Sequence, residues 1–469
     1  QVVDLSIGDG SFPRGLSLVR TYNSGTGQAY TAFTRGWSHN WFMQVTNAPW
    51  PDVDGLSLCE GIGPVWEVSL CSQFYHVVSW SGGAAKYANG GSLSYSGSNL
   101  PGVYSPLDAD NAGRRLEFFG SAFVGGILIG HDTGHFEFTD QDGTHYVFNP
   151  LNAAHGSQKL AYVIAPNGVR ADVHYQSGRV TAVTTSDGYA LLFEYAALPL
   201  NGVLAITKAC VVNLAFTQVT LGGLCPTGAT SVTYGYGTIS IDYRRGDGVS
   251  LGQVLDNALT SATDAVGNNA IYTYDDGGHV DCIKDPGQTN CRVRLTYSTC
   301  LQRTSFYPEA PGAIYPELHL SEAVRRQDFA SGDFLTYAFA ESYECPFDGE
   351  PAFGSFTDAL GNTTAVTVNS SKPVSVTDPL GRTTTNSYTG QFSIVGGPGL
   401  LASTTFPEGN RSEYTYDARA NIVQLRFVAK SGSGAPVLSQ SAAYPSECVN
   451  HKVCNKPTSV TDANGNVTN

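Results

Sequence analysis

The sequence predicts an all-β protein made of antiparallel hairpins, and three observations carry that prediction. The chain has 53 glycines among 469 residues and only 14% charged residues, a composition typical of sheets joined by many turns. Asx-Gly dipeptides recur between segments in which apolar and polar residues alternate, such as Val169–Tyr175 and Val232–Tyr236. No long window combines helical periodicity with capping signals, and Leu318–Asp328 comes nearest to doing so.

The Asx-Gly dipeptides predict where the hairpins turn. Both central residues of a type I′ turn need positive φ, which Asn, Asp and Gly tolerate at the lowest cost. We expect such turns at Asp9-Gly10, Asp54-Gly55, Asn89-Gly90, Asp142-Gly143, Asn167-Gly168, Asp187-Gly188, Asn201-Gly202, Asp247-Gly248, Asp276-Gly277, Asp348-Gly349 and Asn464-Gly465.

Charge and hydropathy argue against two classes of partner. The formal net charge is −14, and Lys and Arg do not cluster beyond pairs such as Arg244-Arg245, so the basic surface that nucleic-acid binding needs is missing. The apolar stretches, such as Phe123–Ile129, have the length of a strand and are interrupted by glycine. We therefore expect neither nucleic-acid binding nor a membrane span.

The cysteines predict disulfides and an oxidising compartment. The ten cysteines form an even set without a CxxC pair, the spacing typical of zinc ribbons and thioredoxin-like sites. Sequential pairing is the simplest arrangement: Cys59 with Cys71, Cys210 with Cys225, Cys282 with Cys291, Cys300 with Cys345, and Cys448 with Cys454. Cys291 could equally pair with Cys300, because the spacing is the same. Since disulfides persist in oxidising surroundings, we expect an extracellular or cell-surface protein.

A repeated Asp-centred turn organises the second half of the chain. Its copies are Thr263–Asn269, Thr357–Thr363, Thr377–Thr383 and Thr461–Val467, which makes Asp264 and Gly267, Asp358 and Gly361, Asp378 and Gly381, and Asp462 and Gly465 equivalent. The matching strand endings are Tyr272–Asp275 and Tyr414–Asp417, with Tyr272, Tyr274, Asp275, Tyr414, Tyr416 and Asp417 as the repeated residues. Degenerate endings occur at Leu295–Tyr297 and Phe193–Tyr195. Neighbouring turns lie about 20 residues apart, which fits one hairpin per unit.

These repeated residues predict structural roles. The Asp side chain can accept hydrogen bonds from turn amides, Gly can take the left-handed backbone conformation, and the tyrosines alternate with Thr along a strand. Because each hairpin buries a face only against its neighbours, the units are expected to extend into one continuous sheet.

The repeat resembles the YD repeat of the Rhs and teneurin family. Ser261–Gly278 and Phe406–Ile422 follow that pattern, the second with Pro407–Asn410 in place of the Asp turn. Leu16–Asn23 followed by Gly36–Asn40 is similar to the opening domain of bacterial Rhs-type proteins. The resemblance implies a sheet that spirals into a hollow shell, in chains much longer than this one.

The resemblance and the repeats together divide the chain. We expect an Rhs-type N-terminal β domain over residues 1–150, β hairpins with degenerate units over 151–260, a repeat with a cysteine-rich insertion over 261–350, and repeats over 351–469. The last unit stops at Asn469 in mid-repeat. We therefore expect strand addition by other copies of the chain or by further repeats of a longer chain.

Several short motifs permit catalytic or binding interpretations, and a structural role is expected for each. His131, His135 and His145 could ligate a metal, and Asp132–Gly134 is similar to an aspartic-protease loop without its second copy. Cys448, His451 and Cys454 could ligate zinc, but a fourth ligand is not evident.

Four further motifs are weaker evidence for a binding or catalytic site. Asp108–Gly113 begins like a calcium loop, but Phe119 stands where a bidentate Glu is needed. Arg245–Asp247 is an Arg-Gly-Asp tripeptide, and Gly248–Gly252 would place Ser250 in a nucleophile elbow without the strand that must precede it. The aromatic insertions around Trp50, Trp66 and Trp80 allow carbohydrate or receptor adhesion, and core packing explains them equally well.

The sequence thus predicts a disulfide-pinned all-β chain whose YD-type hairpins form an extended, curved or spiralling sheet. The expected function is that of a secreted, non-catalytic scaffold without cofactor or metal: a shell wall or a self-assembling surface filament. The alternative, from the same resemblance, is the N-terminal part of an Rhs polymorphic toxin whose repeats enclose a C-terminal toxin domain that is not in this chain.

Overall fold

The computed structural model describes residues 1–8, 15–23, 32–49, 74–80, 83–88, 102–106, 113–119, 134–150, 158–244, 250–302, 318–338, 351–369, 372–390, 399–447 and 453–469. Within these ranges every regular element is a β-strand, which confirms the predicted all-β class. The segment nearest to a helical pattern, Leu318–Asp328, is itself a strand. No helix in the described ranges is long and apolar enough to cross a membrane.

The strands follow one another along the chain with short connections between most of them. They are β1 (Val2–Ile7), β2 (Leu16–Tyr22), β3 (Trp37–His39), β4 (Gln44–Pro49), β5 (Phe74–Trp80), β6 (Gly83–Ala88), β7 (Gly102–Pro106), β8 (Arg115–Phe119), β9 (His135–Thr139), β10 (His145–Pro150), β11 (Gln158–Ile164), β12 (Arg170–Gln176), β13 (Arg179–Thr185), β14 (Tyr189–Ala197), β15 (Leu204–Asn213) and β16 (Thr230–Arg244). The second half holds β17 (Ser250–Thr263), β18 (Asn269–Tyr274), β19 (Val280–Lys284), β20 (Val293–Gln302), β21 (Leu318–Asp328), β22 (Phe334–Ala338), β23 (Pro351–Thr357), β24 (Thr363–Asn369), β25 (Lys372–Thr377), β26 (Thr383–Tyr388), β27 (Leu401–Thr405), β28 (Arg411–Tyr416), β29 (Ile422–Val428), β30 (Leu438–Ala443), β31 (Ser459–Thr461) and β32 (Val467–Thr468).

Two sheets hold all of these strands. β1, β2 and β3 form a small antiparallel sheet, which we call the N-terminal sheet. From β4 to β32 each strand pairs antiparallel with the next, so the rest of the chain forms one large sheet. This simple up-and-down order is what consecutive hairpins produce.

The large sheet branches at β11. At one end of this strand Gln158 and Lys159 pair with Val45 and Gln44 of β4, which closes the sheet on itself over β4–β11. Further along, Tyr162 to Ile164 pair with β12 instead. The ring of β4–β11 therefore continues into a long wall of strands, β12–β32, from a single shared strand.

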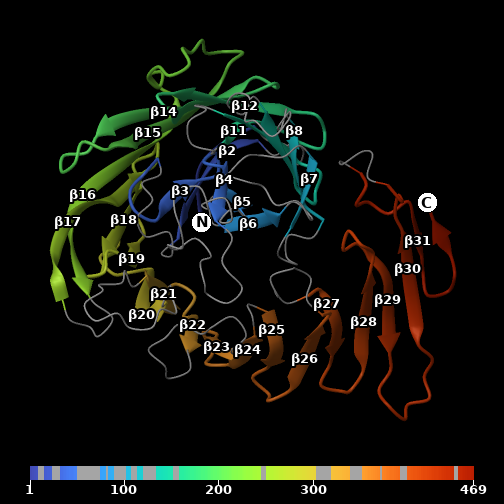
Figure 1. Cartoon of the computed structure of the whole chain (residues 1–469). Helices are drawn as coiled ribbons and strands as arrows, with labels where there is room; N and C mark the ends of the chain where they lie inside the picture. Colours follow the sequence, from blue (N-terminus) through green and yellow to red (C-terminus); the bar gives the residue numbers. More distant parts are fainter. Residues whose placement is uncertain are drawn as a thin grey trace, which may run out of the picture.

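The wall curves around the N-terminal sheet and returns toward its own beginning (Figure 1). β1 and β2 contact β14, β15 and β16 on the concave side. Near the other end of the wall the Asn455 Nδ2 donates a hydrogen bond of 2.7 Å to the carbonyl oxygen of Gly113, which precedes β8. The end of the wall thus lies against the ring in which the sheet begins.

The main core fills the concave side. It contains the N-terminal sheet together with one face of the ring and of the wall up to β19, and its largest fully buried side chains include Leu18, Phe33, Phe136 and Leu191. Alternate residues point to opposite faces of a strand, so Ala182, Leu192 and Cys210 face the convex side. There they form a separate buried cluster with Val219, Cys225 and Ala229.

The predicted turn type is wrong for the described Asx-Gly turns. Among the described residues only Ser177 and Ala420 have positive φ without being glycine, so the Asx residues do not take that conformation. In the turn at Asn167-Gly168 the amide of Gly168 donates to the Ala165 carbonyl and the amide of Ala165 to Val169. Such a three-residue loop needs positive φ at one residue only, and glycine supplies it. The type I′ pattern instead fits Ser177-Gly178, where both residues have positive φ.

Candidate functional site

Arg20 lies at the centre of a buried polar cluster that joins the N-terminal sheet to the wall. Its side chain is 1% exposed and that of Asp4 is 4% exposed. The Arg20 Nε and Nη2 donate to the two carboxylate oxygens of Asp4 at 2.8 and 3.1 Å, and Nη2 also donates to the Tyr272 hydroxyl at 2.9 Å. Such bidentate geometry lets a pair of charges remain ionised inside a protein.

Aromatic rings enclose the guanidinium of Arg20. Its central carbon lies 4.6 Å from the ring centroid of Trp37, 5.5 Å from that of Tyr234 and 5.0 Å from that of Tyr272. The Tyr234 hydroxyl donates to Asp4 at 2.7 Å. Burial alone would lower the Arg20 pKa, but the hydrogen bond and charge of Asp4 with the two tyrosines raise this pKa above its ordinary value. The arginine therefore stays charged.

Further hydrogen bonds attach β2 and β3 of the N-terminal sheet to the same concave face. The Trp37 Nε1 donates to the Tyr274 hydroxyl at 3.0 Å, and the Val280 amide donates to the Tyr22 hydroxyl at 3.0 Å. Each bond joins residues more than 200 positions apart in the sequence. Tyr22, Trp37 and Tyr274 lie in segments that resemble the family, but nothing in these segments predicts the contacts that they make.

The Asp turns share one geometry wherever the repeat occurs. In the turn after β17 the Asp264 Oδ1 accepts from the amides of Val266 and Asn268, and Oδ2 accepts from the Asn268 side chain. Equivalent bonds surround Asp275, Asp358, Asp378, Asp417 and Asp462. The pKa of Asp264 is lowered by its hydrogen bonds, first of all that from the Asn268 side chain. The carboxylate thus takes the place of a backbone acceptor in the turn.

The strand-ending tyrosines join neighbouring strands through their hydroxyl groups. The Tyr274 hydroxyl donates to the Leu259 carbonyl oxygen at 2.6 Å, and the Tyr416 hydroxyl donates to that of Leu401 at 2.8 Å. The same bond occurs from Tyr175 to Leu160, Tyr195 to Val180, Tyr236 to Ile206, Tyr297 to Val280 and Tyr388 to Pro373. We call these bonds the tyrosine latches.

Each tyrosine latch lies at an irregularity of the sheet. The register with the following strand shifts immediately before each of these tyrosines, for example between Thr273 and Tyr274. The accepting carbonyl belongs to the preceding strand, two residues beyond the last paired position, as Leu259 is beyond Ser261. The hydroxyl therefore replaces the ladder hydrogen bond that is lost where the strands separate.

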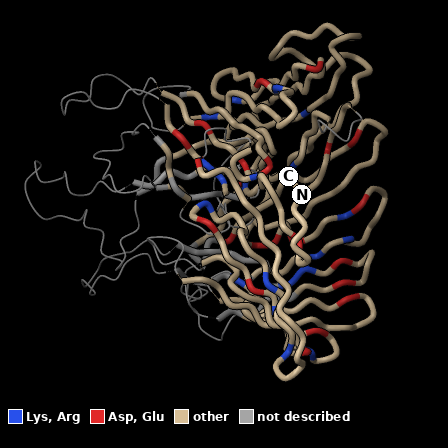
Figure 2. The backbone as a smooth tube through the Cα atoms, turned by 90° about the vertical axis from the view of Figure 1, so that its right-hand side faces the viewer, with Lys and Arg blue, Asp and Glu red and all other residues tan. Residues whose placement is uncertain are grey.

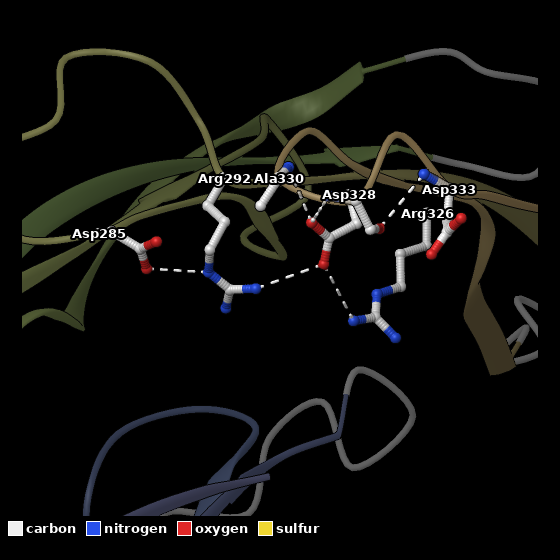
Figure 3. Close-up of polar contacts among 7 residues, drawn as sticks. Asp285, Arg292, Arg326, Asp328, Ala330 and Asp333 are labelled. Carbon is white, nitrogen blue, oxygen red and sulfur yellow. Dashed lines mark hydrogen bonds and ion pairs between the residues drawn. The ribbon is translucent and has the colours of Figure 1, made fainter. Parts of the chain in front are cut away.

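A polar network crosses the edge of the wall at the turns after β19 and β21 (Figure 3). Arg292 Nε contacts Asp285 at 2.8 Å, and its Nη1 contacts Asp328 at 3.4 Å. Arg326 adds a contact of 3.8 Å to Asp328. Figure 2 shows acidic positions recurring at successive turns along this edge. These groups are partly exposed, so each ion pair contributes little to stability on its own.

The structure contains two disulfides with both cysteines described. They join Cys210 to Cys225 and Cys282 to Cys291, in agreement with two of the sequential pairs rather than a Cys291–Cys300 bridge. Cys454 is disulfide-bonded and buried. The side chains of Cys59, Cys71, Cys300, Cys345 and Cys448 lie outside the described part of the chain.

The histidine motif forms a small surface cluster. The Nε2 atoms of His135 and His145 each lie 3.0 Å from a different oxygen of Glu137, and hydrogen bonds from these histidines, that of His145 foremost, lower the Glu137 pKa. His131 lies outside the described residues. Across the described ranges no group of three or more His, Cys, Asp or Glu residues is arranged to hold a metal ion.

Most of the other short motifs lie outside the described residues. These include Asp132 of the protease-like loop, Asp108 of the calcium-like loop, the Arg245–Asp247 tripeptide, His451, Trp50 and Trp66. Ser250 begins β17, and its side chain, like that of Trp80, is not described. Phe119 lies in β8, where its ring stacks on His135.

Comparison with known proteins gives structural neighbours only. No protein-family model matches the chain, and no curated protein matches it. The chain is similar to a Tc holotoxin pore of Photorhabdus luminescens at 12% identity, covering 82% of this chain and 20% of that one with a TM-score of 0.33. It is also similar to TcdB2-TccC3 at 11% identity, covering 93% and 26% with a TM-score of 0.32. The chain thus spans about a quarter or less of these structures, and the scores are too low to carry an argument.

Proposed function

We propose that this chain is a secreted, non-catalytic scaffold that forms part of the wall of a β-sheet shell. One observation carries the proposal: a single sheet runs unbroken in pairing order from β4 to β32 and curves back to its beginning. The repeated Asp turns and tyrosine latches support that sheet through hydrogen bonds within turns and between neighbouring strands. We also propose that the chain is divided into the four parts expected from its sequence, residues 1–150, 151–260, 261–350 and 351–469.

Curvature favours a shell wall over a filament. In a filament grown by strand addition, the last strands must lie away from the first strands of the same sheet, so that the next subunit can add to them. Here Asn455 instead contacts Gly113 beside β8, and Figure 1 shows the last strands turning toward the first ones. The interior of the curve already holds the N-terminal sheet through the buried Arg20 cluster.

Disulfides support the extracellular part of the proposal. The Cys210–Cys225 and Cys282–Cys291 bonds close short loops, and structural disulfides persist mainly in oxidising compartments. Secretion is tested by expression with a secretory leader and mass spectrometry of the unreduced protein, in which both pairs should be found intact.

Electron microscopy of the purified, oxidised chain tests the architecture. We expect discrete curved particles of one subunit with density inside the curve. Filaments of regular repeat would contradict the shell wall and favour strand addition between copies.

One observation favours the toxin-shell candidate as a second function. Cross-strand partners share a face, and the pairs Leu335 with Phe356 and Phe427 with Leu438 continue the concave face that Tyr272 occupies. These four side chains are half-exposed. An enclosed domain could cover them, as the resemblance to polymorphic toxins implies.

Fluorescent-dye binding tests whether this concave face is open. We expect an apolar dye to bind the chain, and Phe356→Ser with Phe427→Ser to reduce that binding. Phe353→Ser is the control, because Phe353 has the opposite strand parity to Phe356 and is also exposed. Equal loss in the control variant would exclude the concave face as the dye site.

A further inference from the structure

A cavity lies on the convex side of the wall, over β11, β12 and β13. Its volume is about 610 Å³, within the range of small-molecule sites. Lys159, His174 and Gln176 line it from the strands, and the segment Thr220–Gly223 lines it on the side away from the sheet. The opposite faces of β11 and β13 carry Leu160 and Val180 of the main core, so the sheet lies between the cavity and the Arg20 cluster.

A disulfide-held segment forms one wall of this cavity. The segment 214–229 connects β15 to β16 and covers the convex cluster of Ala182, Leu192 and Cys210. The Cys210–Cys225 bond fixes it to β15, and the Cys225 amide donates to the Glu194 carboxylate at 2.7 Å. Gly222 passes so close to β12 that a Cβ atom there would lie 3.1 Å from the Gln176 Oε1.

The lining combines a cation with hydrogen-bonding groups. The Lys159 Nζ donates to the Gly178 carbonyl oxygen at 2.6 Å, which holds the ammonium at the cavity edge. The amides of Asn149 and Gln176 and the hydroxyls of Thr181 and Thr220 belong to the same lining. Leu221 and Tyr175 add apolar surface. This mixture suits a compact ligand that carries several hydroxyl groups and one negative charge.

The positive charges near the cavity favour an anionic ligand. Burial and the charge of Arg179 lower the Lys159 pKa, so two cations influence each other here. The Lys159 Nζ donates to a carbonyl oxygen rather than to a carboxylate, although the whole chain carries a net charge of −14. An anion in the cavity would relieve this repulsion.

We propose that this convex pocket binds an acidic saccharide through Lys159, with the Cys210–Cys225 segment as its outer wall. The carboxylate of a uronic acid would pair with the ammonium, and its hydroxyls would bond the amide and hydroxyl side chains. The convex location presents the pocket to the medium around the wall. The proposal stands whether or not the wall encloses a shell.

Ligand-observed nuclear magnetic resonance and calorimetry with D-galacturonate test the proposal on the full, oxidised chain. We expect saturable binding with a dissociation constant of about 1 mM, and much weaker binding of neutral D-galactose. A trigalacturonate probe separates a free sugar acid from the end of a polysaccharide: tighter binding of the trimer assigns the pocket to polysaccharide.

Matched variants locate the binding. Lys159→Met should lower galacturonate affinity at least about tenfold, while Lys430→Met, in an exposed turn on the last part of the wall, should leave it unchanged. Joint replacement Cys210→Ser with Cys225→Ser should abolish binding, and Cys282→Ser with Cys291→Ser should not. Absence of galacturonate binding to the native chain, equal binding of galactose, or unchanged affinity in Lys159→Met would each overturn the proposal.

Discussion

The Arg20 guanidinium donates a hydrogen bond of 2.9 Å to the Tyr272 hydroxyl across 252 residues of sequence. This bond joins the second strand of the chain to a repeat strand in the middle of the wall. Both groups are buried, and Asp4 neutralises the arginine. The hydrogen bond to Tyr272 therefore attaches the N-terminal sheet to the wall, while Arg20 and Asp4 pair within the N-terminal sheet itself.

Arg20→Met should destabilise the chain strongly. The substitution leaves the Asp4 carboxylate buried without its partner, which costs about 3–5 kcal/mol of unfolding free energy. Urea unfolding measures the loss. The exposed pair of Arg170 and Asp172 supplies the control, since Arg170→Met should cost less than about 1 kcal/mol. If Arg20→Met with Asp4→Leu is no more stable than Arg20→Met alone, the unpaired carboxylate is not the cause.

The tyrosine latches should differ in strength according to burial. Tyr195→Phe and Tyr416→Phe each remove a hydroxyl that donates to a carbonyl at 2.8 Å. Burial is the first cause of the raised pKa at both tyrosines, and it raises the Tyr195 pKa further. Tyr195→Phe should cost about 1–3 kcal/mol, because the Val180 carbonyl is left without a partner, and Tyr416→Phe should cost less because water can replace the hydroxyl. Equal costs in urea unfolding would count against a role for burial.

Ala420→Gly should stabilise the chain. Ala420 has a φ of 62° in the turn after β28, where Gly361 occupies the equivalent place after β23 with a φ of 87°. Left-handed backbone costs a residue with a Cβ roughly 1–2 kcal/mol, partly offset by the greater unfolded-state freedom of glycine. We expect a net gain of about 0.5–1 kcal/mol in thermal unfolding. Gly361→Ala is the reciprocal change and should destabilise; a loss of stability in Ala420→Gly would contradict the turn geometry.

Alkaline pH should weaken the contact between the N-terminal sheet and the wall. Burial raises the pKa of Tyr22 from 10.0 to about 12. Because the folded-state pKa is the higher one, the contribution of Tyr22 to stability is complete below pH 10 and is lost as the pH rises through about 12. Unfolding midpoints recorded across this range should fall less steeply in Tyr22→Phe. Identical slopes for the two proteins would disprove this assignment.

The sequence predicts the repeating parts of this fold better than the parts that join them. Local patterns such as Thr357–Thr363 determine their own turn, so the hairpins and the all-β class follow from them. The turn type was predicted wrongly, because dipeptide composition does not show that one glycine φ is sufficient. The Arg20–Tyr272 contact could not be predicted, because a contact between residues far apart in the chain produces no repeating pattern in the sequence around either residue. The convex pocket depends on how the 214–229 segment folds back, which residue spacing does not determine.

Distance measurement between the two ends of the large sheet tests the central account most directly. Spin labels introduced at positions 119 and 453 through non-natural amino acids would leave the cysteines untouched. Both positions are exposed; position 119 ends β8, the strand that follows Gly113, and position 453 lies two residues before Asn455. A curved wall that returns to its ring predicts one short, narrow distance in pulsed electron resonance. A long or broad distribution would show that the sheet does not return, and would contradict the shell wall.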